Sequence, residues 1–344
     1  MRKLRVAAMA GSLCVALVLA GCGGADDDAS PGGGGGGGDE LETVSIGITS
    51  WHTWYWWLMA AEEEGLMEPY GVDLDVVTFS NTGQIASAVL GQSVQIGLIA
   101  AEQTFTLQEQ APELMLIGAN ITTSPYTLLG AEGVDSVEDL RGATLGVTSE
   151  GSSADYFTSL LMMRSHDMEH GTDFSYVNAG PPSERASAMA AGELQAVMNF
   201  EPDALRLIEG GAKVLDRAAD YENLKGVEVN SLAATTTWYE ANRELAENFA
   251  RGYLASIEWL YDEANRDRAE EILTERMELE PEMAATTYER FVIELQAWDP
   301  DGQIDPERLE QTRANAEEAG LEMPEAGELE DRFDNSIMEA AGDS

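Results

Sequence analysis

Thiols are almost missing from this chain of 344 residues. Its two cysteines, Cys14 and Cys22, lie close to the N-terminus, so the remainder has no thiol for a disulfide, a zinc site or a nucleophile. With only 3 histidines besides, we expect neither a metal site nor a cofactor. Stability must therefore come from a hydrophobic core, and the chain is long enough to form one in two domains.

Positive charge is also scarce. The chain has 63 Asp and Glu against 19 Lys and Arg, a formal net charge of -44, and lysine beyond Lys3 occurs only at Lys213 and Lys225. A surface of this sign repels nucleic acid and anionic membranes, so we expect no nucleic-acid partner. Because the carboxylates are spread along the whole chain, a well-hydrated surface suited to high salt is the favoured interpretation. A cationic ligand is the alternative.

The N-terminus has the pattern of an export signal. Basic residues at 2, 3 and 5 precede an apolar stretch over 6–19 that is too short to span a bilayer, and Leu19-Ala20-Gly21-Cys22 closes it. This segment resembles the lipobox of prokaryotic lipoproteins. The resemblance implies a signal peptide over 1–21, lipid on Cys22 and an extracytoplasmic protein anchored to the cell membrane. An ordinary secretory signal with a chance cysteine is the alternative.

Residues 22–42 follow as a spacer. They include Asp26-Asp27-Asp28 and an unbroken glycine run over 32–38, a composition that cannot form a core. We therefore predict a flexible tether, with ordered structure beginning near Thr43.

From there, strand and helix patterns alternate, which is typical of a parallel sheet covered by helices. The pattern occurs twice: Ala86-Ser87-Ala88 recurs as Ala186-Ser187-Ala188, and Gln95 as Gln195, at the same offset. We therefore predict an α/β fold of two related lobes. Beyond Trp238 only helices are expected, and this tail should pack on the first lobe. The predicted strands are 44–48, 72–79, 94–99, 114–121, 126–130, 144–147, 174–177 and 194–200, and the predicted helices 54–64, 84–90, 136–140, 152–164, 184–191, 245–261, 269–277, 281–295 and 306–319.

Several motifs, in order and spacing, resemble the nitrate/sulfonate/taurine group of ABC-transporter solute-binding proteins, which includes the NMT1-like proteins and carriers of thiamine-pyrimidine precursors. The resemblance covers roughly 44–262. Two departures stand out: Gly91-Gln92-Ser93 moves a turn glycine back by one, and Gln95 and Gln195 replace aspartates. The matching motifs are Asn81-Thr82-Gly83-Gln84, Ile96-Gly97-Leu98-Ile99, Asp139-Leu140-Arg141-Gly142, Gly192-Glu193-Leu194-Gln195-Ala196-Val197 and Glu201-Pro202.

This resemblance implies a type II periplasmic-binding-protein fold, in which a small solute is clamped between two lobes. Lobe I would comprise 43–128 plus 230–340 and lobe II 129–229, with crossings near 126–132 and 227–235. The implied partners are an ABC permease and its ATPase, and we expect a monomer.

Ligands of open α/β sheets bind beyond the carboxyl ends of the strands, where helix N-termini present free N–H groups. The first such end is unusually aromatic, and a helix can bury only one stripe of it, so some of these rings should face the cleft. The predicted binding residues are Trp51, His52, Trp54 and Tyr55 after the first strand, Thr82, Gly83 and Gln84 after the second, Ala101 and Glu102 after the third, and Ser149, Ser152, Ser153, Asn199 and Glu201 in lobe II. Core packing is the alternative for the tryptophans, and a hinge role for Glu201.

The solute is harder to predict. No lysine lies at these strand ends, arginine near them is limited to Arg185, and Glu102 and Glu201 disfavour a bare anion. Aromatic rings with carboxylates suit a flat nitrogen heterocycle of the thiamine-pyrimidine type. The alternatives are a sulfonate, taurine or nitrate, and, in other classes, an exported sensor lipoprotein or a pyrimidine-synthase-like enzyme. We expect no enzyme, because Lys213 and Lys225 lie away from the predicted cleft.

Overall fold

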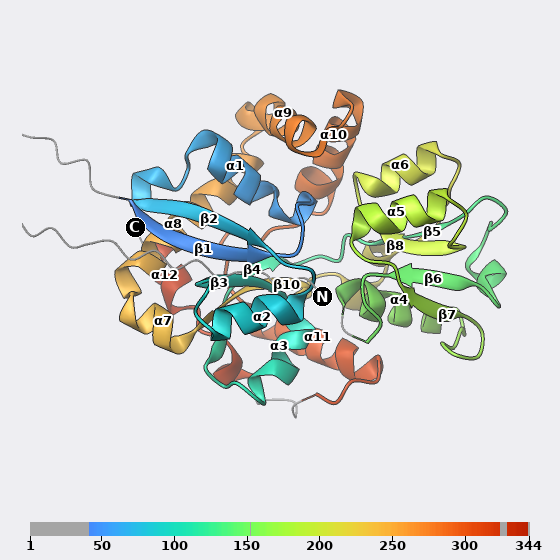
Figure 1. Cartoon of the computed structure of the whole chain (residues 1–344), viewed down its shortest axis with the longest axis horizontal. Coiled ribbons are helices and arrows are strands. Elements are labelled where there is room, and N and C mark those ends of the chain that lie inside the picture. Colours follow the sequence, from blue (N-terminus) through green and yellow to red (C-terminus); the bar gives the residue numbers. More distant parts are fainter. Residues whose placement is uncertain (1–40, 152, 324–328, 343–344) are drawn as a thin grey trace, which may run out of the picture. The chain divides into compact units, whose positions relative to one another are not determined.

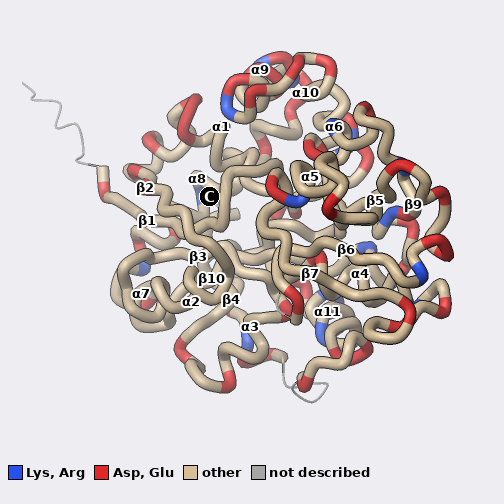
Figure 2. The backbone as a smooth tube through the Cα atoms, turned by 45° about the vertical axis from the view of Figure 1, so that its right-hand side comes forward, with Lys and Arg blue, Asp and Glu red and all other residues tan. Residues whose placement is uncertain are grey.

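The computed structural model describes residues 41–151, 153–323 and 329–342 (Figure 1). The predicted signal peptide, Cys22, nearly all of the predicted tether and Ser152 lie outside the described residues. Within these ranges, no helix is long and apolar enough to cross a membrane. Asp and Glu are scattered over nearly every element, with few Lys and Arg between them (Figure 2).

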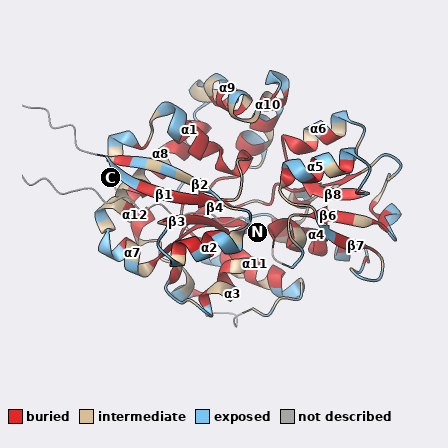
Figure 3. Cartoon of the chain, in the orientation of Figure 1, coloured by how far each residue is buried: buried red, intermediate tan, exposed pale blue. Residues whose placement is uncertain are grey.

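Five strands form the first sheet, in the spatial order β2-β1-β3-β10-β4. β1 is parallel to β2 and β3, whereas β10 runs antiparallel to β3 and β4. β3 and β10 are buried at every residue, as expected for strands covered on both faces (Figure 3). The strands are β1 (Glu42–Ile48), β2 (Val72–Thr78), β3 (Ile96–Ala100), β4 (Leu114–Ile121) and β10 (Asn230–Thr235).

The second sheet repeats this arrangement in the order β7-β6-β8-β5-β9. Its first three strands are parallel, and β5 runs antiparallel to both neighbours. The two glutamines of the sequence repeat play the same part: Gln95 Oε1 accepts from the Ser45 N–H at 2.8 Å and Gln195 Oε1 from the Thr144 N–H at 3.0 Å. The two-lobed α/β fold is therefore confirmed. The strands are β5 (Thr127–Gly130), β6 (Thr144–Val147), β7 (Ser175–Asn178), β8 (Ala196–Asn199) and β9 (Lys213–Arg217).

The chain changes sheet twice. It leaves the first sheet after Ile121 and joins the second at Thr127, and it returns through residues 218–229 to β10. The boundary expected after residue 128 therefore falls inside β5. The sequence pattern did not predict β9, whose first two residues are exposed at the sheet edge.

Helices flank both sheets. The helix expected over 54–64 is divided into a 3-10 turn and an α-helix, because His52 Nδ1 accepts the Trp54 N–H and starts a separate turn. The helix expected from Ser136 is a 3-10 turn with the predicted capping box to Asp139. The elements are η1 (Thr53–Tyr55), α1 (Trp56–Glu64), η2 (Glu68–Tyr70), α2 (Thr82–Leu90), α3 (Ala101–Gln108), η3 (Val137–Leu140), α4 (Ala154–Ser165), α5 (Pro182–Ala190), α6 (Asp203–Glu209), η4 (Ala218–Asp220) and η5 (Glu222–Leu224).

The helical tail packs on the first sheet, as predicted. The Trp56 indole N–H donates to the Ala269 carbonyl at 3.1 Å, and the Tyr253 hydroxyl donates to the Ala119 carbonyl of β4. It also contacts the second lobe, since α11 packs against α4. The helix expected over 281–295 becomes a π-helix midway. The tail comprises α7 (Thr236–Ala241), α8 (Arg243–Tyr261), η6 (Glu263–Asn265), α9 (Arg266–Met277), α10 (Pro281–Tyr288), the π-helix Glu289–Glu294, α11 (Pro306–Glu318), η8 (Glu330–Arg332) and α12 (Ser336–Gly342).

Candidate functional site

A cavity of about 400 Å³ lies where strands of both sheets end. The first sheet contributes the segment after β1 and the ends of β2 and β3, and the second contributes the segments after β6, β7 and β8. This volume is within the range of small-molecule sites. A second hollow of about 460 Å³ shares Thr49, Thr82, Thr148 and Ser153 with it, so the two form one continuous cleft.

A larger hollow of about 1250 Å³ lies elsewhere, lined mainly by α8, the π-helix and residues 295–300. It receives none of the predicted binding residues and does not lie at the carboxyl ends of the parallel strands. Its buried-side charges are already matched, since Arg308 pairs with Asp299 at 2.7 Å. The cleft between the sheets is therefore the better candidate.

Aromatic rings form one wall of the 400 Å³ cavity. Trp54 stacks on Phe200, which follows β8, with ring centroids 5.3 Å apart, and Tyr126 meets both rings edge-on at 5.6 and 5.5 Å. The Trp54 indole N–H is buried and donates to no residue that the structure describes. A wall of this kind offers a ligand an apolar face together with one free hydrogen-bond donor.

A buried ion pair forms another wall. Arg185 of α5 is fully buried and its Nη1 lies 3.1 Å from Asp155 Oδ2 of α4. The guanidinium also donates to the carbonyls of Met198 (2.9 Å) and Gly180 (2.8 Å), and Asp155 accepts the Thr148 N–H at 2.7 Å.

One atom of each partner of this pair remains unused. Arg185 Nη2 and Asp155 Oδ1 are buried without a partner among the described residues. Unpaired buried polar atoms cost free energy, and such atoms in a cavity wall indicate groups arranged for a ligand.

The remaining titratable groups of the cleft are held uncharged near neutral pH. Burial, and then the nearby Arg185 guanidinium, lowers the pKa of His52 to about 3. Burial raises the pKa of Glu102 to about 8, with a smaller contribution from the Asp155 carboxylate. With Asp155 and Arg185 balancing each other, the cleft has close to zero net charge at pH 7.

Glu102 makes stability depend on pH. Its pKa in the folded protein is about 8 against an ordinary value of 4.5, so between these values the folded protein retains a proton that the unfolded chain has lost. We expect the stability of the wild type relative to Glu102→Gln to fall as the pH rises from about 5 to 8, by up to about 1.4 kcal/mol per pH unit, and to level off above pH 8. Urea unfolding of both proteins between pH 5 and 9 measures this. Parallel stability curves would contradict it.

Most of the predicted binding residues converge on the cleft. His52, Trp54 and Tyr55 line the 400 Å³ cavity, Gly83, Glu102 and Ser149 line the 460 Å³ hollow, and Thr82 and Ser153 line both. Four elements far apart in the sequence are thereby brought together.

The other predicted residues lie elsewhere. The Trp51 ring packs under the Arg276 guanidinium at 4.5 Å, and Ala101 is buried at the start of α3. The Gln84 side chain accepts the Ser80 N–H, and the Asn199 amide donates to the Pro182 carbonyl. Glu201 is buried beside Arg217, and its carbonyl accepts from the Thr53 hydroxyl at 2.6 Å, which links the two lobes. None of these five lines the cleft.

Sequence reasoning did not propose Asp155, Arg185, Tyr126 or Phe200 as binding residues. The available signal for Asp155 was a lone carboxylate at the start of a helix that is otherwise mostly apolar to Met163. Arg185 gave no comparable signal, because nothing in a single sequence shows that an arginine on a helix is fully buried.

Comparisons with known proteins agree with this architecture. The profile of the NMT1-like family matches residues 37–274. The periplasmic nitrate-binding protein NrtA from Synechocystis PCC 6803 superposes with a TM-score of 0.74 at 13% identity, over 88% of this chain and 89% of that one. No curated protein sequence matches the chain.

Two further solved structures are similar. A putative sulfonate ABC transporter component, the periplasmic sulfonate-binding protein SsuA from Methylobacillus flagellatus KT, has a TM-score of 0.67 at 16% identity, over 88% of this chain and 94% of that one. The desulfurization enzyme DSZB has a TM-score of 0.63 at 15% identity, over 88% and 99%. At these identities the likeness shows the two-lobed fold, which both binding proteins and an enzyme possess. The profile match covers more than half of the sequence, and the chain belongs to the NMT1-like family.

Proposed function

We propose that this protein is the extracytoplasmic solute-binding component of an ABC importer. It would capture a small solute between its two lobes and deliver it to a membrane permease. The observation that carries this proposal is the cleft itself, whose aromatic wall and unpartnered donors and acceptor come from both lobes. A solute held by both lobes favours their closed arrangement over the open one, and this population shift would signal the loaded state to the permease.

The solute that fits best is a flat, uncharged nitrogen heterocycle of the aminopyrimidine kind. Trp54 and Phe200 offer an apolar surface, Asp155 Oδ1 can accept a ring or amino N–H, and the Arg185 Nη2 and Trp54 Nε1 hydrogens can be donated to ring nitrogens or carbonyls. An isolated anion fits less well, because the one cation of the cleft is already paired with Asp155. A sulfonate or nitrate remains the second candidate, favoured by the free hydrogens on Arg185 Nη2.

A ligand screen distinguishes the two. Thermal shift and tryptophan fluorescence would be recorded with aminopyrimidines, purines, aliphatic sulfonates, taurine, nitrate and amines. We expect a heterocycle to raise the melting temperature and to change the emission of Trp54, which lies in the cleft wall. If a sulfonate or nitrate does so and no heterocycle does, the heterocycle proposal is wrong and the anion is the solute.

Asp155→Asn tests the acceptor. The substitution keeps the shape but replaces a carboxylate by an amide, so we expect the affinity for the heterocycle found in the screen to fall by about 10- to 100-fold, as for loss of a charge-assisted hydrogen bond. Isothermal titration calorimetry measures the change. Asp216→Asn is the matched control, because Asp216 is bound by His166 and Tyr221 within lobe II and does not line the cleft. Equal affinity in wild type and Asp155→Asn would contradict the assignment.

The anchor and the partners follow from the sequence pattern. We propose that the protein works as a monomer on the outer face of the membrane, tied by lipid on Cys22 and a glycine-rich tether over 22–42. Such a tether keeps the binder near its permease while leaving it free to turn. Transport and sensing would use the same cleft, and a permease that responds to the loaded protein distinguishes them.

A further inference from the structure

Behind the cleft lies a small buried chamber of about 40 Å³. Its wall includes Glu102 of α3, Ser124 of the first crossing segment, Glu228 of the second, and Thr312 of α11. The chamber therefore touches both segments that connect the lobes, and through Glu102 it adjoins the solute cleft. A cavity of this size has room for one or two water-sized occupants.

Three oxygens of this wall are unused. Glu102 Oε1, Ser124 Oγ and Glu228 Oε2 are fully buried and have no hydrogen-bond partner within the described ranges. The side chains that bear them are themselves buried, with exposed fractions of 6%, 1% and 0%. Because the chamber is so small, wall groups from three separate segments must lie close to one another.

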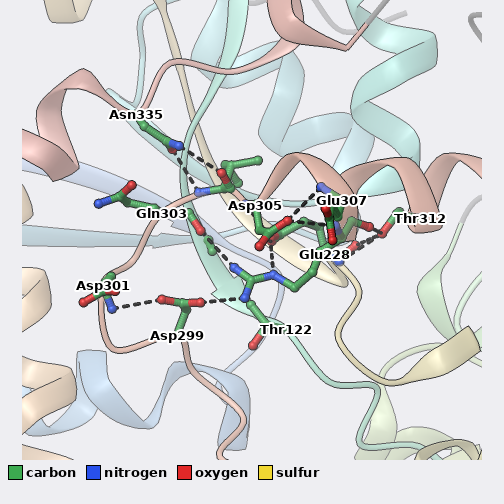
Figure 4. Close-up of polar contacts among 12 residues, drawn as sticks. Thr122, Glu228, Asp299, Asp301, Gln303, Asp305, Glu307, Thr312 and Asn335 are labelled. Atoms are coloured by element: carbon green, nitrogen blue, oxygen red, sulfur yellow. Dashed lines mark hydrogen bonds and ion pairs between the residues drawn. The ribbon is translucent and has the colours of Figure 1, made fainter. Parts of the chain in front are cut away.

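The other oxygen of Glu228 is firmly held. Figure 4 shows Glu228 among polar groups of the loop before α11 and of α11 itself. Its Oε1 accepts from Arg308 Nε at 3.0 Å and from the Asp305 N–H at 3.3 Å, and its own N–H donates to the Thr312 hydroxyl at 2.9 Å. These contacts fix the carboxylate and leave Oε2 without a partner.

Negative charge exceeds positive charge around the chamber. Glu102 and Glu228 both line it, and the cation bound to Glu228, Arg308, is shared with Asp299 at 2.7 Å. No arginine, lysine or histidine lines the chamber. Two carboxylates beside one shared guanidinium are costly to bury unless a further cation or a proton balances them.

We propose that this chamber binds a monovalent cation, represented by sodium, through Glu102 Oε1, Ser124 Oγ and Glu228 Oε2. Oxygen ligands of this kind suit hard cations. Among the residues that the structure describes, no group of three or more His, Cys, Asp or Glu is placed to hold a metal ion, which disfavours a divalent ion. A single water could donate to both carboxylates and accept from Ser124, but it would leave the excess charge unbalanced.

The bound cation ties the two crossing segments to α3 and α11. It stabilises the folded protein by mass action. Because Glu102 also lines the cleft, the ion supports the wall against which the solute rests. This inference stands on the chamber alone and does not depend on which solute the cleft binds.

The test compares melting temperatures in sodium chloride and choline chloride at equal concentration, up to about 1 M and at fixed pH. We expect sodium to raise the melting temperature above choline by at least about 2 °C in the wild type. Ser124→Ala should remove the difference. The matched control is Ser231→Ala, since Ser231 Oγ is also buried and unpartnered but does not line the chamber, and the sodium effect should persist there. Glu102→Gln is the second variant and should behave like Ser124→Ala.

An equal response of wild type to sodium and choline would overturn the proposal, as would a sodium effect that survives in both Ser124→Ala and Glu102→Gln. Crystals of the wild-type protein grown with thallium(I) in place of sodium give a direct readout. An anomalous peak in the chamber supports the site. A water peak alone, without anomalous signal, refutes it.

Discussion

Replacing Arg185 by methionine is expected to lower the free energy of unfolding by about 3–5 kcal/mol. The side chain is fully buried, and its guanidinium binds Asp155 together with the carbonyls of Met198 and Gly180. Removing it leaves the Asp155 carboxylate buried without a counter-ion, and this uncompensated charge is the main cost. Urea unfolding monitored by circular dichroism measures the loss.

Arg141→Met is the control for this prediction. Arg141 lies in the same lobe and pairs with Asp173, but its side chain is 51% exposed, so the loss should not exceed about 1 kcal/mol. Similar losses in the two variants would show that Arg185 contributes no more than an ordinary surface pair. The double variant Arg185→Met, Asp155→Leu should recover part of the stability, because it removes the unpaired carboxylate.

Trp298→Ala is expected to cost about 3–5 kcal/mol as well. Trp298 is fully buried between the helical tail and the first sheet, and its indole N–H donates to the Trp54 carbonyl at 3.1 Å. Its backbone N–H donates to the Tyr261 hydroxyl at 3.1 Å, and its ring lies 5.9 Å from that of Phe291. The substitution therefore leaves a large cavity beneath the aromatic wall of the cleft.

Two readouts separate this effect from a general loss of packing. Trp259→Ala, at a half-buried position of α8, should cost clearly less. In Trp298→Ala the affinity for the solute should also fall, because Trp54 loses a contact that positions it, whereas Trp259→Ala should bind as the wild type does. Unchanged binding in Trp298→Ala would show that the tail does not support the cleft.

Local patterns predicted most of the fold. β4 and β6 have the predicted bounds, and most other strands and helices of the two lobes differ from them by one to three residues. The reason is that buried parallel strands are continuous apolar runs flanked by turn residues, a signal that is local in the sequence. β9 had no such signal, because it is a half-exposed edge strand, and the π-helix was missed because its apolar pattern continues that of α10.

The candidate site was predictable only in part. The rule that ligands bind at the carboxyl ends of strands located His52, Trp54, Thr82, Glu102 and Ser153 at the cleft. It could not say which way a side chain faces: Trp51 and Trp54 are three residues apart, yet one lies under Arg276 and the other in the cleft wall. That choice depends on what the helical tail, some two hundred residues later, packs against.

The sequence by itself determined the class of fold, the internal repeat, the helical tail and the family, because periodicity, turn residues and ordered motifs are local properties of a chain. The tertiary structure alone decided the chemistry of the cleft. Whether Arg185 is a free cation or half of a neutral pair depends on Asp155, which lies 3.1 Å away in space but on a different helix. Charge balance in a buried site is set by such distances and by exclusion of water, and neither can be obtained from the order of residues.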